Sequence, residues 1–394
     1  MTTTIAPRSR HDHRSTPVPV AGLFDRIGNH GHLRVDGYLP GPRDVRVTTS
    51  LEHQLGLRKG DFIEGLMDAE APAQGDGQRG RQRVLVRVER VNGVAPDRIS
   101  RRPHFADLTP VHPTERLRME TSPTVLATRV IDLIAPIGKG TRGLIVAPPK
   151  AGKTMLLKAV AEAVARNHPN CHLMVVLLDE RPEEVTDMRR SVRGEVVSST
   201  FDRPAADHVS TAELAVEHGK RLVEQGREVV ILLDSITRLC RAYNNSAAGK
   251  GRTLSGGVDA AALHGPKRLF GAARAIETGG SLTMLATALV ETGSRADDHY
   301  FEELKGTGNM ELRLSRALAD SRTFPAVDIS LSGTRREEIL LAADELAALR
   351  RLRRVLGARD AHQSAELLLD HLRRTAGNAE FIQHINQNAA PNGR

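Results

Sequence analysis

Residues 147–154, Ala-Pro-Pro-Lys-Ala-Gly-Lys-Thr, have the types and spacing of a phosphate-binding loop. They follow an apolar run, 143–146, that indicates a strand, and they precede a helical run, 155–165. In that context the backbone amides of the turn and of the helix N-terminus cradle phosphate oxygens. Lys153 would reach the β- and γ-phosphates, and Thr154 would bind Mg²⁺. Because Ala147 stands where the strict pattern has glycine, the strand and helix context carries this prediction of a nucleotide site.

Acidic residues end two other apolar runs. Asp234 ends the run 229–233, where a carboxylate can face the metal ion of a nucleotide, although many buried strands end in an Asp that caps a helix. Asp179 and Glu180 follow the run 173–178. Glu180 is the candidate to polarise an attacking water, whereas Asp179 is equally compatible with a structural role. Residues 183–184, both Glu, are expected in the first turn of the next helix, where acids favour the helix dipole.

These residues must be positioned by a domain in which strands and helices alternate. From residue 124 onward continuous apolar runs alternate with helical stretches, which is typical of a parallel sheet buried on both faces. The C-terminal part has helical patterning; residues 334–337 fit a capping box, and Gly377 fits a helix stop. The sequence therefore predicts an α/β domain over 124–394. The predicted strands are 143–147, 173–178, 195–200, 229–233 and 282–287.

The N-terminal part has a different sequence pattern. Short strand-like segments, separated by turn residues, predict a small all-β barrel over 21–92. Residues 1–20 are rich in Thr, Pro, Arg and His and are expected to be a disordered basic tail. Four prolines between 92 and 118 indicate a linker, which we predict over 93–123. The candidate strands of the barrel are 31–35, 44–48, 62–67 and 83–91.

Charge and cysteine content limit the class of protein. The formal net charge of +8 favours a polyanionic partner, with nucleic acid before a membrane surface, but charge alone does not decide the question. Cys171 and Cys240 form no CxxC pair, so we expect neither a disulfide framework nor a zinc site built on cysteines. No apolar core of a signal peptide and no run of transmembrane length is present, so we expect a cytoplasmic protein.

Several longer segments resemble the Rho family of bacterial transcription termination factors. The resemblance extends from about Phe105 to the C-terminus and includes Ala147 in place of the first glycine. The matching segments separate this family from fold relatives such as rotary ATP synthase subunits and recombinases. They are 143–157, 178–186, 233–239, 256–259, 305–312 and 332–335.

The resemblance implies a fold and an activity. The fold would be an α/β RecA-like P-loop ATPase domain preceded by a small all-β OB-fold (cold-shock-like) domain, and the family's usual N-terminal helical subdomain is expected to be missing. The activity would be ATP hydrolysis that depends on RNA and drives 5′-to-3′ movement along nascent RNA, releasing it from RNA polymerase. ATP and Mg²⁺ would be the cofactors, and the assembly a homohexamer. The alternatives are a nucleotide-gated RNA-binding ring with weak translocation, or a DNA-acting or rotary relative.

The resemblance also implies roles for single residues around ATP. Glu180 would be the general base, Phe324 would lie on the adenine, and Arg335 would be an arginine finger supplied by the neighbouring subunit. A cation on a loop can neutralise charge that develops on a neighbour's γ-phosphate, although Arg335 also fits an ordinary surface arginine. Lys153 and Arg181 complete the catalytic set, and Thr154 and Asp234 would hold the metal. The nucleotide-binding set is Gly138, Lys139, Gly140, Thr141, Arg142, Gly143, Lys150, Ala151, Gly152, Lys153, Thr154, Met155, Arg181, Asp234 and Phe324.

Two RNA sites are implied as well. The inner site would use two loops, in which Arg252 and Arg295 stand where the family usually has Lys; the charge is kept, but the hydrogen-bond geometry changes. The outer site would be the barrel, where His30, His32 and Arg46 replace aromatic residues on which bases stack. Both histidines fit ordinary exposed barrel positions equally well. The predicted inner residues are Arg252, Thr253, Leu254, Ser255, Gly256, Gly257 and Arg295; the outer ones are Asn29, His30, Gly31, His32, Leu33, Arg34, Asp44, Val45 and Arg46.

Overall fold

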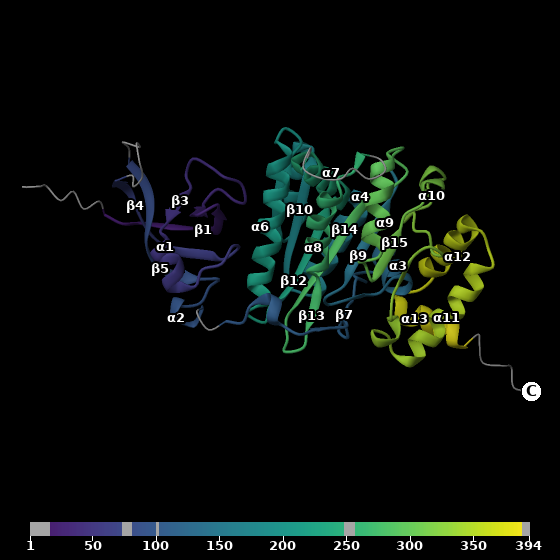
Figure 1. Cartoon of the computed structure of the whole chain (residues 1–394). Coiled ribbons are helices and arrows are strands. Elements are labelled where there is room, and N and C mark those ends of the chain that lie inside the picture. Colours follow the sequence, from purple (N-terminus) through teal and green to yellow (C-terminus); the bar gives the residue numbers. More distant parts are fainter. Residues whose placement is uncertain (1–15, 73–80, 100–101, 248–256, 388–394) are drawn as a thin grey trace, which may run out of the picture. The chain divides into compact units, whose positions relative to one another are not determined.

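The computed structural model describes residues 16–72, 81–99, 102–247 and 257–387. The chain divides into two compact units, 1–101 and 102–394, which are described separately (Figure 1).

The first unit is a closed five-stranded barrel with the strand order β1-β2-β3-β5-β4. Neighbouring strands are antiparallel except β3 and β5. Its core contains Phe24, Leu33, Val45 and Ile63, each with no exposed surface. The predicted all-β barrel is confirmed, and β1 is an additional strand that begins inside the predicted tail. The elements are β1 (Val18–Ile27), β2 (His30–Arg34), β3 (Val45–Val47), α1 (Thr49–Leu55), β4 (Phe62–Pro72), β5 (Arg81–Val91) and α2 (Pro96–Ile99).

The second unit is built on a nine-stranded sheet whose main path is β11-β10-β12-β14-β9-β15-β16. The pairs from β11 to β15 are parallel, as the continuous apolar runs predicted. The strands are β6 (Pro110–Val111), β7 (Arg116–Leu117), β8 (Ile137–Gly138), β9 (Arg142–Ala147), β10 (His172–Glu180), β11 (Glu195–Thr200), β12 (Glu228–Asp234), β13 (Arg274–Ile276), β14 (Ser281–Leu289), β15 (Met310–Arg313) and β16 (Gly333–Thr334).

Helices cover both faces of this sheet (Figure 1). Side chains of a strand alternate between faces, so Leu173, Val175 and Leu177 of β10 pack in one core with helix α4. On the other face, α6 places Gly219 against Val229 and Ile231 of β12. The helices are α3 (Leu126–Ile134), α4 (Lys153–Asn167), α5 (Pro182–Ser191), α6 (Ala205–Val223), α7 (Ile236–Ala247), α8 (His264–Gly271), α9 (Arg295–Lys305), α10 (Arg316–Asp320), α11 (Ala343–Gly357), α12 (Ala361–Arg373) and α13 (Asn378–Gln387), with 3₁₀ turns at Phe105–Asp107, Ala260–Leu263 and Glu337–Ile339.

The predicted linker over 93–123 differs from the structure in its second half. Leu117 and Met119 have no exposed surface and belong to the core of the second unit. The carboxylate of Asp132 accepts hydrogen bonds from the backbone N–H groups of Met119 and Glu120, at 2.8–3.0 Å. The prolines therefore mark an extended segment that packs on this unit, because its apolar side chains and its amides find partners there.

Two local predictions in the C-terminal part are wrong. Thr334 lies in β16, and its hydroxyl donates to the carbonyl of Pro136 at 2.7 Å instead of capping a helix. Gly377 does not stop α12, which ends at Arg373; it directly precedes α13. Both patterns were short, and the long-range pairing of β16 with β15 decided the first.

Candidate nucleotide and RNA sites

The phosphate-binding loop lies at the carboxyl end of β9, and α4 begins at Lys153. Lys150 and Gly152 have left-handed backbone conformations, with φ of 67° and 90°. Gly152 stands at the N-cap of α4, and no side chain there caps the helix. The first amides of the helix thus remain oriented toward an incoming anion, as the sequence predicted for ATP phosphates.

Lys153 is held by two acids at this edge of the sheet. Its Nζ lies 2.6 Å from Asp234 Oδ1 and 3.3 Å from Glu180 Oε1. Asp234 Oδ1 also accepts a hydrogen bond from the Thr287 hydroxyl at 2.8 Å. Because β10, β12 and β14 are parallel neighbours, their carboxyl ends bring these groups together. The structure therefore joins the three residues that the sequence predicted from separate motifs, beside Thr154 and the first turn of α4.

The surroundings of Glu180 shift the pKa of its carboxyl group. Burial raises its pKa above the ordinary value, and the negative charge of Asp234 acts in the same direction, while Lys153 opposes both. The side chain is 4% exposed. A carboxylate with a raised pKa accepts a proton more readily near neutral pH, which suits a general base. Arg181 follows Glu180 at the N-cap of α5, and Glu183 and Glu184 lie in the first turn of that helix as predicted.

Arg238 on α7 belongs to this site, and the sequence reasoning assigned it no role. Its Nη2 lies 3.3 Å from Glu180 Oε1, and its Nη1 lies 3.3 Å from Asp179 Oδ2. Asp179 thus pairs with a neighbouring cation. The available signal was a basic residue one helical turn after Asp234, but its orientation toward Glu180 depends on how α7 packs.

An apolar pocket of about 300 Å³ adjoins the loop. Phe324 is 41% exposed there, and a Cβ placed on Gly152 would lie 3.5 Å from its ring. Met155 is also highly exposed and lines the pocket. A flat, largely apolar wall beside a phosphate-binding loop fits a nucleobase. Further lining residues that sequence reasoning missed are Thr124, Val125, Leu126, Ala127, Ala159 and Leu314.

The turn 138–143 lies at the other end of β9, away from the phosphate-binding loop. Its amides are occupied within the chain: Gly138 N–H donates to the Thr141 hydroxyl, Gly140 N–H to the Thr283 hydroxyl, and Lys139 N–H to a backbone carbonyl. The Arg142 guanidinium donates to the carbonyls of residues 273 and 307. In its own chain this turn therefore does not line the nucleotide site, in contrast to the prediction for Gly138–Gly143.

Arg335 lies at that same amino-terminal edge. It follows β16, which pairs with the first residues of β15, and its N–H donates to the carbonyl of Asn309. Its side chain is exposed. Burial lowers the pKa of Arg142, and the charges of Arg274 and Arg335 lower it further, so these cations share one region. Within one chain, Arg335 and Lys153 occupy opposite edges of the sheet.

The predicted outer RNA residues divide into two groups. The first group, His30, His32 and Arg46, lies on the outer face of the barrel. His30 is exposed, and His32 and Arg46 are half-buried. His32 pairs in register with Asp25 on one side and with Arg46 on the other. Burial lowers the pKa of His32, and the charge of Arg34 lowers it further. The His32 ring is therefore less basic than a free imidazole.

The second group is structural. Arg34 is 2% exposed and forms ion pairs with Asp25, at 2.6 Å, and with Asp44. Leu33 and Val45 lie in the barrel core. Gly31 lies against Phe24, where a Cβ would approach the ring to 2.8 Å. Burial and pairing leave these residues mainly their backbone for contact with another molecule, and their contact with RNA stays a prediction. Asn29, which precedes β2, is exposed.

Phe62 is an exposed aromatic residue of the barrel that sequence reasoning missed. It is 38% exposed and pairs in register with Leu23, which pairs in turn with Arg34. By strand alternation it shares the outer face with His32. The segment 62–67 is a predicted strand of the barrel, and only the barrel geometry shows that its first side chain faces outward.

The inner RNA loops are only partly described. Arg252, Thr253, Leu254, Ser255 and Gly256 lie outside the described residues. Gly257 is exposed, and its carbonyl accepts a hydrogen bond from Asn244. Arg295 is the exposed first residue of α9, in the segment that follows the carboxyl end of β14.

Comparisons with known proteins agree with this architecture. Residues 127–334 match the ATP synthase alpha/beta family, nucleotide-binding domain, and residues 20–97 match the Rho termination factor, RNA-binding domain. A transcription termination factor Rho from Streptomyces coelicolor is 62% identical over 366 residues, which are 93% of this chain and 85% of that protein. The chain belongs to the Rho family of transcription termination factors. The resemblance read from the motifs and the predicted fold class are thereby confirmed.

Other relatives of the Rho family are longer. The chain spans 52% of the Rho of Streptomyces lividans, at 61% identity over 93% of this chain, and 61% of that of Mycobacterium tuberculosis, at 56% identity over 94% of this chain. Among solved structures, an ATPase from the type III secretion system of pathogenic bacteria has a TM-score of 0.60 at 21% identity, covering 72% of this chain and 87% of that one. This likeness concerns the fold alone. Among the helices of the described residues, none combines the length and the apolar character that a membrane-spanning segment requires.

Proposed function

We propose that this member of the Rho family is an RNA-dependent ATPase that moves 5′-to-3′ along nascent RNA and releases it from RNA polymerase. The observation that carries the proposal is the joining of Lys153 to Glu180 and Asp234 beside the phosphate-binding loop, in a chain whose other unit matches an RNA-binding domain. An ATP site and an RNA-binding fold in one chain are the two parts that such a motor requires.

The residues at the loop fit ATP together with Mg²⁺. A threonine hydroxyl and an aspartate carboxylate are hard oxygen ligands of the kind that Mg²⁺ prefers, so Thr154 and Asp234 would hold the ion. When bound, Mg²⁺ neutralises phosphate charge. The pocket beside Phe324 would take the adenine, and Lys153 would move from its acidic partners to the β- and γ-phosphates. Glu180 would then be released to accept a proton from the attacking water.

Hydrolysis also requires a cation near the γ-phosphate. Arg335 lies at the wrong edge of its own chain's sheet for this task, so we propose that a neighbouring copy supplies it, within a cytoplasmic homohexamer. The turn 138–143 lies at the same edge, and its predicted role in binding ATP applies only to a nucleotide on that neighbour. Arg181, at the carboxyl edge, would contact the nucleotide within its own chain.

RNA would bind at two places. Arg295 and the segment 252–257 are proposed to contact RNA inside the ring. On the barrel, His30, His32 and Arg46 would form a platform that stacks bases less strongly than aromatic residues do. A nucleotide-gated RNA-binding ring with weak translocation is the alternative that this platform favours.

The test measures steady-state ATP hydrolysis by the full chain with poly(C), poly(U), mixed RNA or single-stranded DNA. We expect stimulation by RNA and not by DNA, and a loss of at least about a hundredfold in the Lys153→Ala variant, which removes a main transition-state stabiliser. Stimulation by DNA would contradict an RNA motor. Unwinding of a duplex that has a 5′ single-stranded RNA extension separates translocation from the alternative.

A further inference from the structure

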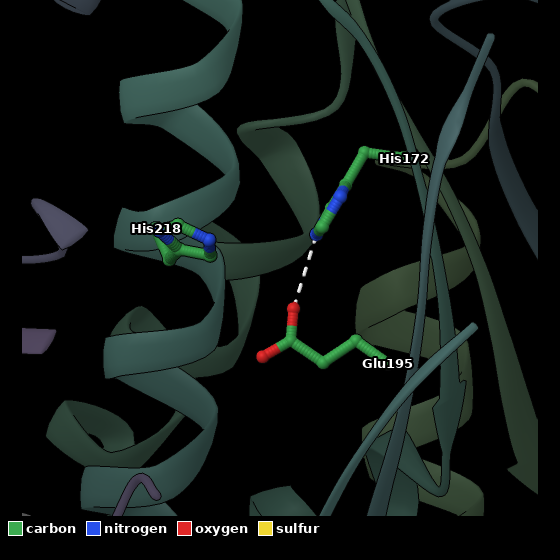
Figure 2. A group of neighbouring side chains, drawn as sticks. All are labelled: His172, Glu195 and His218. Atoms are coloured by element: carbon green, nitrogen blue, oxygen red, sulfur yellow. Dashed lines mark hydrogen bonds and ion pairs between the residues drawn. The ribbon is translucent and has the colours of Figure 1, made fainter. Parts of the chain in front are cut away.

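Three potential metal ligands meet at the amino-terminal edge of the sheet, outside the nucleotide site. His172, Glu195 and His218 each offer one ligand atom, and these atoms all lie within 4.8 Å of one another. His172 Nε2 lies 3.0 Å from Glu195 Oε2, and the two imidazole rings meet edge to face with their centres 5.8 Å apart. Figure 2 shows the three side chains gathered between α6 and the sheet.

The register of the fold explains this meeting. His172 is the first residue of β10, and Glu195, the first residue of β11, pairs with Met174. Since residues two apart on a strand and partners on adjacent strands face the same side, His172 and Glu195 both point toward α6. Helix α6 crosses this face, placing His208 against Ser199 near the carboxyl edge and His218 near the amino edge.

We infer that His172, Glu195 and His218 form a binding site for a Zn²⁺ ion. Two imidazole nitrogens and one carboxylate oxygen are a ligand set that zinc uses, with a fourth position left open. Mg²⁺ and Ca²⁺ favour oxygen ligands alone, so this site would discriminate against them.

The distances are close to those that a tetrahedral ion requires. Zinc bonds of about 2.0–2.2 Å place neighbouring ligand atoms roughly 3.4 Å apart. The pair His172 and Glu195 is already at 3.0 Å, and the ion would replace the proton that these two atoms share. The longest separation within the group is at most 4.8 Å. A side-chain movement of roughly 1 Å, which rotation about side-chain bonds allows, completes the geometry.

The surroundings give the ion access and define its fourth ligand. His218 is 6% exposed, whereas His172 and Glu195 are half-buried and line a cavity of about 350 Å³. Arg193 and Arg227 line the same cavity. Their charge would weaken metal binding somewhat and would favour an anion, such as hydroxide or chloride, at the open position.

This site is separate from the Mg²⁺ of the nucleotide. β10 has nine residues, so His172 lies about 26 Å from Glu180 at the other end of the strand, at about 3.3 Å per residue. The inferred role of the ion is therefore to link α6 with β10 and β11. An ion that binds only the folded chain stabilises the folded state.

The experiment uses the full chain, freed of metal by dialysis against a chelator and kept without nucleotide. Zn²⁺ binding is measured by competition with a chromogenic chelator, and Co²⁺ is used as a second probe, because tetrahedral Co²⁺ has strong visible absorption. We expect one tight equivalent of zinc per chain and a melting temperature that rises by about 5 °C at saturating Zn²⁺. Mg²⁺ should leave the melting temperature unchanged.

The variants Glu195→Gln and His218→Gln keep side-chain size and should each raise the apparent Kd for Zn²⁺ by at least about a hundredfold, since loss even of an outer partner costs ten- to a hundredfold. In each variant that folds, the melting temperature is compared with and without Zn²⁺, and we expect the zinc-dependent rise to be lost. The matched control is His384→Ala, an exposed histidine 3.9 Å from Glu380 on α13, which should retain the tight equivalent.

A second control removes His11 and His13, because paired histidines can hold zinc adventitiously. The inference is overturned if the tight equivalent persists in Glu195→Gln and His218→Gln, or if it disappears in the His11→Ala, His13→Ala double variant instead. It is also overturned if the unaltered chain shows neither a tight equivalent nor a zinc-dependent shift.

Discussion

Replacing Arg335 by Gln tests whether one chain can complete its own ATP site. Arg335 follows β16, which pairs with Met310 and Glu311, and these residues pair with the start of β9. β9 has six residues, so the loop at its other end lies about 20 Å away. A unit charge at that distance in water contributes about 0.2 kcal/mol before screening, which corresponds to a factor below about 1.5 in rate.

An arginine finger that touches the γ-phosphate is worth about 10³–10⁵ in turnover. The two hypotheses therefore differ by orders of magnitude. If a neighbouring copy supplies Arg335, Arg335→Gln should lose at least about a thousandfold of the RNA-stimulated ATPase rate and keep its affinity for a fluorescent ATP analogue. Arg336→Gln is the matched control, since Arg336 is the adjacent exposed arginine, and it should keep the rate.

Mixing two inactive variants identifies the chain that supplies the charge. In a mixture of Arg335→Gln with Lys153→Ala, random assortment gives about one interface in four that joins an intact loop to an intact finger. Recovery of ATPase activity on mixing is the expected result. The reasoning would be refuted by an Arg335→Gln rate within about twofold of the Arg336→Gln rate, or by no recovery on mixing.

Three further predictions concern the nucleotide pocket and the barrel. Arg238→Gln should move the acidic limb of the pH profile of kcat to higher pH. The rate falls as the pH drops through the raised pKa of Glu180, and loss of the Arg238 charge, which lowers this pKa, raises the pKa further. An unchanged limb would exclude Glu180 as the titrating base. Phe324→Ala should weaken ATP binding about two- to tenfold, measured by fluorescence titration, because an aromatic contact contributes about 0.5–1.5 kcal/mol. Equal affinity would show that the pocket is unused. His30→Phe with His32→Phe should tighten binding of a short RNA oligomer about tenfold or more, since stacking contributes about 1–3 kcal/mol per base, and unchanged anisotropy curves would place the platform elsewhere.

The sequence by itself determined the local chemistry of the nucleotide site. A phosphate-binding loop is a continuous segment, so its types and spacing are readable without the fold. The strands that carry Glu180 and Asp234 were readable too, because apolar runs of this length indicate buried parallel strands, whose carboxyl ends share one edge. The long motifs were distinctive enough to indicate the family, which the comparisons confirmed.

Only the tertiary structure decided which charged residues are buried and which groups they face. Arg34 and Arg46 both lie in short predicted strands of the barrel, yet Arg34 is buried between two aspartates. Pairing across strands cannot be read from the sequence of one strand. In the same way Arg238 turned toward Glu180, and Arg335 came to lie a strand length from its own nucleotide site. The meeting of His172 and His218 follows from how α6 crosses the sheet. Burial and pairing arise from contacts between distant segments, whereas sequence patterns report only on neighbours along the chain.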